Sequence, residues 1–257
     1  MADNSPQDGP DAGAGVRSVV RALDLLALFD DERSWSIAEL TRASGLPKTT
    51  VLRLVATLEN RGLLWTRPDR RVSPGTGMLR WARLAEDAWR LPERSRLIMA
   101  ELAAACGETV NVYVRQGTSR ICVAQHEGPQ SIRHVVRVGD ALPLWAGAAS
   151  KVLLADAADD LIDAVARQSP AGADFRHELH AQIATARRDG YAVSHGEREV
   201  GASGLAAPIH GDGAHVVAAL ALGGPTPRFA QPDVARFAPA VVGAAREMSQ
   251  LGFGPRA

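Results

Sequence analysis

The chain has 257 residues, of which 46% are hydrophobic, and its 29 Lys and Arg balance 29 Asp and Glu. This length and apolar content allow one or two domains with a real core, and the balanced charge argues against a histone-like coating protein. No apolar run approaches the roughly 20 residues of a membrane span, and the N-terminus lacks an apolar signal segment, so we expect a cytoplasmic protein with no membrane partner. Residues 1–15, rich in Gly, Asp, Ala and Pro, predict a disordered tail.

The zero net charge hides an asymmetry along the chain. Residues 15–80 contain eleven Lys and Arg against seven Asp and Glu, so this segment carries a net charge of +4. A basic segment in an otherwise balanced chain is typical of a part that contacts a polyanion such as DNA.

Two amphipathic helices are predicted first in the chain. The earlier one covers residues 18–30 and would turn its apolar side inward at Val19, Leu23, Leu26 and Phe29. The shorter one follows Ser36, because Ser36 and Glu39 have the spacing of a capping box, and Gly45 then permits a tight turn.

A third helix is predicted between Leu46 and Asn60. Its apolar residues fall at helical spacing and would pack inward: Val51, Leu54, Val55 and Leu58. The opposite face and the helix start are polar and cationic, with Lys48, Thr49, Thr50 and Arg53. Arginine can bridge guanine acceptors in the major groove, and threonine can meet bases or phosphates, so this helix is predicted to read DNA.

A small hairpin should follow this helix. Residues 63–66 and 72–74 predict two short strands, joined by a turn that contains Arg67, Arg70 and Arg71. Such a basic tip is suited to phosphate or minor-groove contacts. The segment 16–77 therefore predicts a winged helix-turn-helix, whose partner would be double-stranded DNA.

The remaining elements mix helices and strands, which indicates an α+β fold. Residues 78–90 predict a linker helix, and residues 91–254 a second domain. Within that domain helices are expected over 91–102, 147–154, 178–188 and 233–251, and strands over 110–114, 121–125, 132–138, 191–194, 205–210 and 216–222. The nearly all-apolar run 216–222 should be the most buried strand.

Signatures of catalysis and metal binding are absent from the pattern. Cys106 and Cys122 have no nearby ligand pair and fit reduced thiols. The run Gly201–Leu205 lacks the final glycine of a nucleophile elbow. We therefore expect neither an enzyme nor a metal or other cofactor.

Several motifs together resemble the IclR family of transcriptional regulators. They are Val19–Leu26, Ile37–Leu40, Gly45–Leu54, Thr109–Val112, Glu127–Ser131, Val138–Gly139, Leu142–Leu144, Arg187–Val193 and Ala206–Pro208, and the likeness covers residues 16 to about 251. The resemblance implies a C-terminal GAF-like antiparallel sheet flanked by helices, which binds a small organic effector and helps to form a homodimer or homotetramer. Trp81 and Trp89 on the linker helix are candidate interface anchors, or else core residues.

The resemblance also implies where an effector would bind. Its pocket would be formed by Trp145, Gly147, Ala148, Ala149, Ser194, Gly204, Ala221 and Gly223. At the last four positions, relatives that bind small keto acids have an acid, a thiol and two hydroxyls, so this pocket should be roomier and less polar. With Trp145 as an aromatic wall, we expect an aromatic or apolar-bodied carboxylic acid or a derivative of one. The alternative is that Trp145 is a core residue and the pocket has collapsed.

Two functions remain open from the sequence. The favoured one is a sequence-specific transcriptional regulator whose operator affinity changes when the effector binds. The alternative is a ligand-independent DNA-binding protein whose C-terminal domain only oligomerises. They differ in whether a small molecule alters DNA binding.

Overall fold

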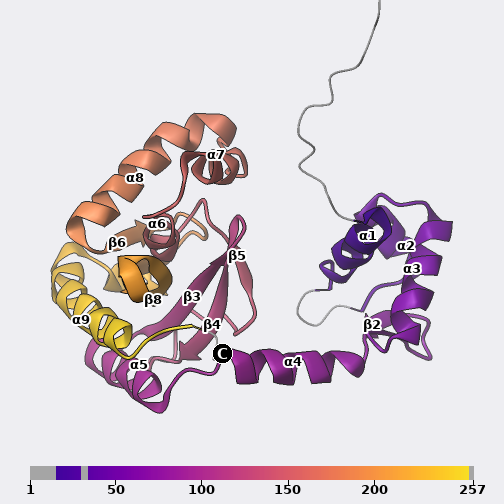
Figure 1. The fold of residues 1–257 in the computed structure, drawn as a ribbon, viewed down its shortest axis with the longest axis horizontal. Helices are drawn as coiled ribbons and strands as arrows, with labels where there is room; N and C mark the ends of the chain where they lie inside the picture. Colours follow the sequence, from indigo (N-terminus) through magenta and orange to yellow (C-terminus); the bar gives the residue numbers. More distant parts are fainter. Residues whose placement is uncertain (1–15, 30–33, 255–257) are drawn as a thin grey trace, which may run out of the picture. The chain divides into compact units, whose positions relative to one another are not determined.

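The computed structural model describes residues 16–29 and 34–254 (Figure 1). It divides into two compact units, the first ending at Asp87 and the second beginning at Ala88. The predicted disordered tail at 1–15 lies outside the described residues. In the described ranges, no helix combines the length and apolar character needed to cross a membrane.

The first unit contains helices followed by a small hairpin. The helices are α1 (Arg17–Leu26), α2 (Ile37–Ser44) and α3 (Lys48–Asn60), and the strands are β1 (Leu64–Thr66) and β2 (Val72–Pro74). The two strands pair antiparallel, with Trp65 opposite Ser73. Helix α4 (Gly77–Ala88) follows and runs to the boundary between the units.

Local signals in the sequence explain these elements. The capping box is confirmed: the Glu39 amide donates to Ser36 Oγ (3.2 Å), and the Ser36 amide donates to a Glu39 carboxylate oxygen (2.8 Å). Gly45 ends α2 with φ of 65°, a left-handed conformation that glycine adopts without a steric penalty. These two features fix the start and end of the helix before α3.

One face of α1 differs from the prediction. Leu25 is completely buried, whereas Val19 and Leu23 are 53% and 59% exposed, so their assignment to the inward side was wrong. Helix α1 and the turn after it carry two apolar stripes at helical spacing, one over residues 16, 19, 20 and 23 and one over 22, 25, 26 and 29. Only the second stripe packs on the core of this unit, and the first stays exposed.

The second unit is built on a six-stranded antiparallel sheet. The strands are β3 (Thr109–Gln116), β4 (Ser119–His126), β5 (Ala141–Pro143), β6 (Ala192–His195), β7 (Ala202–His210) and β8 (Val216–Pro225), in the order β5-β4-β3-β8-β7-β6. As predicted, β8 is deeply buried, because it lies between β3 and β7 and both its faces are covered.

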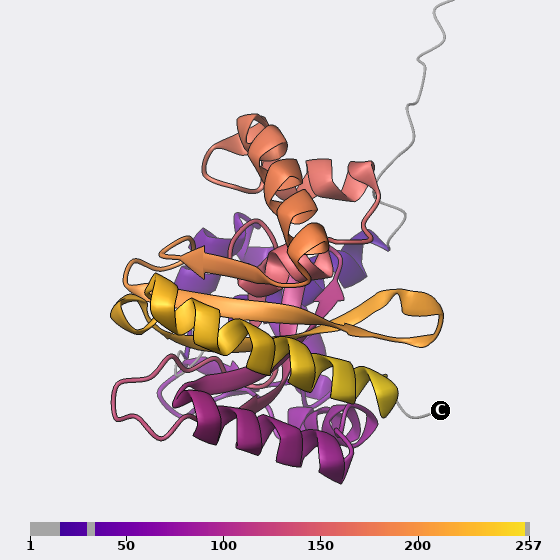
Figure 2. The same cartoon turned by 90° about the vertical axis from the view of Figure 1, so that its left-hand side faces the viewer.

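Helices cover both faces of this sheet, as Figure 2 shows. On one face lie α5 (Glu93–Cys106) and α9 (Gln231–Gln250), which pack on residues such as Val112, Leu205 and Leu220. On the other lie α6 (Ala148–Leu153), α7 (Asp159–Arg167) and α8 (Arg176–Asp189), which pack around Tyr113, Ala206 and Ala219. Successive side chains of β3, β7 and β8 point to opposite faces of the sheet, so each strand contributes to two hydrophobic cores.

The structure of this unit differs from the sequence prediction at one segment that was expected to be a strand and at two elements that were not expected, β5 and α7. Residues 132–138 are not a strand; side-chain bonds hold the segment, including one from Gln125 Nε2 to the Val136 carbonyl oxygen (2.6 Å). The apolar character there reflects Val136, which is buried. Helix α7 was not predicted, although Ile162, Val165 and Ala166 give it a buried stripe.

Candidate nucleic-acid interface and ligand pocket

Helix α3 presents two chemically different faces. Val51, Val55 and Leu58 are buried in the core of the first unit. Lys48, Thr49 and Arg53 are exposed, and Thr50 is half-buried. The predicted DNA-reading side chains therefore lie together on the solvent side of a helix that its own core holds rigidly.

The wing has a tight turn at its tip. The Arg70 amide donates to the Arg67 carbonyl oxygen (2.9 Å), and the Arg67 amide donates to that of Arg71 (2.8 Å). Arg70 has φ of 63°, a conformation that most side chains avoid. Both Arg67 and Arg70 are exposed, and Arg67 lies 3.5 Å from the Asp69 carboxylate. The tip thus carries two cations available to an anionic partner.

Arg71 lies in a different environment from its neighbours. Its Nε donates to Ser34 Oγ (2.8 Å), and its Nη2 donates to a Glu39 carboxylate oxygen (3.0 Å). The bonds from Ser36, and then the charge of Arg71, hold the pKa of Glu39 below its ordinary value. Arg71 therefore ties the wing to the start of α2, and its predicted contact with DNA competes with these bonds.

A cavity in the second unit lies where the sheet carries small side chains. Ser194, Gly204 and Gly223 are cross-strand neighbours on β6, β7 and β8, and Ala221 lies opposite Asn111 of β3. Because side chains are short or missing there, the start of α6 and the loops around it do not fill the space above the sheet. At Gly223 an added Cβ would lie 3.2 Å from the His134 ring.

Seven of the eight residues predicted from the resemblance line this cavity: Gly147, Ala148, Ala149, Ser194, Gly204, Ala221 and Gly223. Trp145 is not among the lining residues; it is partly buried against the core on the α6 side of the sheet. The cavity therefore has no tryptophan wall, and the aromatic ring beside it is that of Tyr113.

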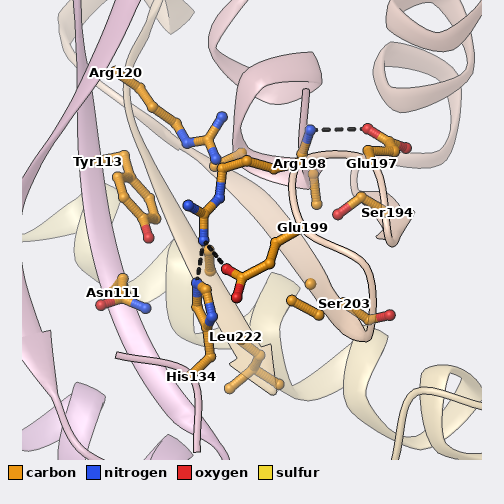
Figure 3. A pocket seen from close by; sticks show the side chains of 17 residues that line it. Asn111, Tyr113, Arg120, His134, Ser194, Glu197, Arg198, Glu199, Ser203 and Leu222 are labelled. Carbon is orange, nitrogen blue, oxygen red and sulfur yellow. Dashed lines mark hydrogen bonds and ion pairs between the residues drawn. The ribbon is translucent and has the colours of Figure 1, made fainter. Parts of the chain in front are cut away.

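Polar and charged side chains make up much of the rest of the lining (Figure 3). They are Asn111, Tyr113, Arg120, His134, Glu197, Arg198, Glu199 and Ser203. The cavity is therefore polar, because the four positions from which a less polar pocket is expected form only part of its lining. Burial raises the pKa of the Tyr113 hydroxyl and lowers that of His134, so both are neutral near pH 7.

Arg120 is the most buried cation of the lining, with 5% of its surface exposed. Its Nη1 donates to the carbonyl oxygen of Pro143 (2.8 Å), to that of Ala146 and to Ser150 Oγ. The guanidinium carbon lies 5.3 Å from the centre of the Tyr113 ring, within cation–π range. Loss of hydration lowers the pKa of Arg120 to about 10, so the side chain keeps its charge at neutral pH.

A loop between β6 and β7 closes the other side of the cavity. Its ends are Gly196 and Gly201, both with positive φ. Arg198 reaches across the cavity, where its Nη2 lies 3.1 Å from His134 Nε2 and 3.2 Å from a Glu199 oxygen (Figure 3). Glu197 is bonded to Lys151 and accepts from the Gly147 amide (2.8 Å).

The free space that remains is small. The cavity measures about 60 Å³, which is room for a few water molecules. Pockets for drug-sized ligands usually hold roughly 300–1,000 Å³. In this structure the Arg198 side chain occupies part of the space in which a larger ligand would lie. No group of three metal-binding side chains occurs among the described residues.

The first unit is a winged helix-turn-helix with an exposed cationic recognition helix, and the second is a helix-covered antiparallel sheet with a small polar cavity. This combination defines a class of DNA-binding regulators. Two family models match the chain: the IclR helix-turn-helix domain over residues 18–68, and the bacterial transcriptional regulator IclR C-terminal domain over residues 87–250. The chain belongs to the IclR family. Its relatives are transcriptional regulators and not enzymes.

Individual relatives resemble the whole chain. An IclR-family structure from Rhodococcus sp. is 48% identical, covers 97% of this chain and 98% of its own, and has a TM-score of 0.64. The transcriptional regulator KipR of Bacillus subtilis is 29% identical over 92% of this chain and 98% of its own. An IclR homologue from Microbacterium hydrocarbonoxydans, in complex with 4-hydroxybenzoate, is 24% identical, covers 91% of this chain and 100% of its own, and has a TM-score of 0.65.

Proposed function

We propose that this protein is a cytoplasmic, sequence-specific transcriptional regulator whose affinity for its operator changes when a small carboxylic acid binds in the cavity of the second unit. The observation that carries the proposal is the pairing of an exposed DNA-reading helix with a cavity that contains a buried guanidinium. An effector can change DNA affinity only by binding the DNA-competent and DNA-incompetent conformations unequally.

An aromatic acid is the effector class we favour. Arg198 occupies the cavity from a loop whose two ends are glycines, so its withdrawal would open space beside the Tyr113 ring. The 4-hydroxybenzoate complex of the Microbacterium homologue supports such a ligand for this fold and supplies the first compound to test. A 2-oxo acid of two or three carbon atoms would fit with less movement.

Self-association is part of the proposal. Val16, just before α1, and Val19, Val20 and Leu23 on it form an exposed apolar stripe. Helix α4 separately exposes Leu79, Trp81 and Leu84, whereas Trp89 packs on the core of the second unit. One winged helix contacts few bases, so a dimer that reads two half-sites would provide specificity.

The assignment of base reading to α3 can be tested with one variant on two kinds of DNA. DNA selected from a random pool by the full-length protein would supply the operator. Arg53→Ala should weaken binding to the selected DNA by about 1–3 kcal/mol and relax the preference at one position, because a base contact is lost. Equal losses on selected and random DNA would contradict a base-reading role for Arg53.

The alternative is a ligand-independent DNA-binding protein, and the small cavity is the observation that favours it. The two functions separate when DNA binding is measured with and without carboxylic acids. If no acid that binds the protein changes its DNA affinity, the second unit serves oligomerisation only.

A further inference from the structure

The cavity contains a buried positive charge that forms no ion pair in the described part of the chain, although the charge of Glu197 acts on it without a direct bond. Arg120 is 5% exposed, and the groups it bonds are two backbone carbonyls and the Ser150 hydroxyl, all of them uncharged. No carboxylate among the described residues forms an ion pair with it. An isolated ion in a protein interior loses hydration, and a counter-ion is the usual compensation.

The carboxylates nearest to the cavity are already engaged. Glu197 pairs with Lys151 and accepts from the Gly147 amide, and Glu199 pairs with Arg198 at 3.2 Å. Each of these anions therefore has its own cation, and Arg120 is the cation left over.

The guanidinium of Arg120 also has hydrogen-bonding capacity to spare. Its Nε is buried without a partner, and in the described structure Nη2 takes part in no hydrogen bond. At Gly147 an added Cβ would lie 2.9 Å from Nη2, so the missing side chain leaves this nitrogen accessible to the cavity. A guanidinium with unused donors on one edge is suited to a bidentate carboxylate.

We propose that Arg120 is the residue that recognises the anionic group of the effector, so that the cavity selects carboxylates over neutral compounds of the same shape. This assignment rests on the proposed function, in which the cavity is the effector site. Arg198 moves aside or turns its guanidinium to the same anion, and the ring of Tyr113 packs against the body of the ligand.

The test compares carboxylates with their amides on the full-length protein. The probes are benzoate and 4-hydroxybenzoate, with benzamide and 4-hydroxybenzamide as neutral partners of nearly identical shape. Affinities are measured by calorimetric titration at constant ionic strength, and melting temperatures are recorded with the same compounds. We expect at least one acid to bind at least tenfold more tightly than its amide.

Three variants locate that preference. Arg120→Gln should remove the advantage of the acid over the amide, while Arg120→Lys, which keeps the charge but loses the planar fork, should retain part of it. Arg115→Gln is the matched control, because Arg115 lies opposite Arg120 on β3, is exposed and does not line the cavity. It should bind acids as the parent protein does.

Each outcome decides the assignment. Unchanged acid binding in Arg120→Gln, equal binding of acids and amides, or no binding of either acid to the parent protein would overturn it. If Arg120→Gln does not fold, the acid–amide comparison on the parent protein and the Arg120→Lys variant decide. Operator binding is measured separately, so a regulator whose effector is neutral would be recognised as such.

Discussion

Replacing Arg71 with alanine should loosen the DNA-binding unit itself, whereas replacing its neighbour Arg70 should change only what the wing can bind. Both arginines are in the basic turn, and the sequence alone does not distinguish them. The difference is structural, because the Arg71 guanidinium bonds Ser34 and Glu39 while Arg70 is exposed at the tip.

The magnitude follows from the contacts that Arg71 loses. The side chains of Arg71 and Glu39 are 39% and 41% exposed, so their ion pair adds little to the stability. Each hydrogen bond to Ser34 adds about 0.5–1.5 kcal/mol. Allowing for solvent exposure, we expect Arg71→Ala to destabilise the local structure by about 1–2 kcal/mol, which corresponds to a factor of roughly 5–30 in an opening equilibrium.

Hydrogen exchange on the full-length protein measures this opening. Beside Arg71, the backbones of Trp35 and Val72 are joined by two hydrogen bonds of 2.9 and 2.7 Å. The amide hydrogens of peptides that contain these residues should therefore exchange with solvent roughly 5–30 times faster in Arg71→Ala. Arg70→Ala should leave their exchange unchanged. It should weaken binding to all DNA similarly. The slope of log affinity against log salt concentration should fall by about one, which corresponds to the loss of one phosphate contact. Unaltered exchange in Arg71→Ala, or equal exchange changes in both variants, would refute the reasoning.

Two further predictions concern stability. The pKa of Glu39 is lowered, chiefly by its bonds with Ser36. The stability that this carboxylate provides is therefore complete above its ordinary pKa of 4.5 and is lost as the pH falls through the lower pKa of the folded protein. Denaturant melts should show this loss of stability at acid pH in the parent protein and a smaller loss in Glu39→Gln. Gly224→Ala should destabilise the second unit by about 1–3 kcal/mol, because its Cβ would collide with the buried Glu108 carboxylate. Gly243→Ala, at an exposed position of α9 with open space around it, should instead stabilise by about 0.5–1 kcal/mol in the same melts; equal signs for the two glycine variants would contradict this packing.

The first unit was predictable because its signals are local. The capping box at Ser36, the turn at Gly45 and the strands of the wing each depend on a few neighbouring residues. The orientation of α1 was not predictable, since either of its two apolar stripes satisfies helical spacing. Which stripe packs inward depends on the shape of the rest of the unit.

The cavity was predictable only in part, because its charged groups come from long-range packing. Along β4, Arg120 occupies a position that an alternating strand would turn to solvent. It is buried because β5 pairs with β4 and the loop before α6 covers the side chain. Nothing in the local sequence specifies that covering. The small residues of β7 and β8 could be found through the resemblance, since they mark departures at known positions.

The most direct test of the account is fluorescence anisotropy of the full-length protein on its selected operator and on a scrambled sequence at physiological salt. Each DNA is measured with and without an acid that the titrations show to bind. The account predicts binding to the operator at least 10³-fold tighter than to scrambled DNA, and a change of roughly 5–150-fold in operator affinity when the acid is present. Equal affinity for the two DNAs, or an operator affinity that the bound acid leaves unchanged, would contradict an effector-controlled, sequence-specific regulator.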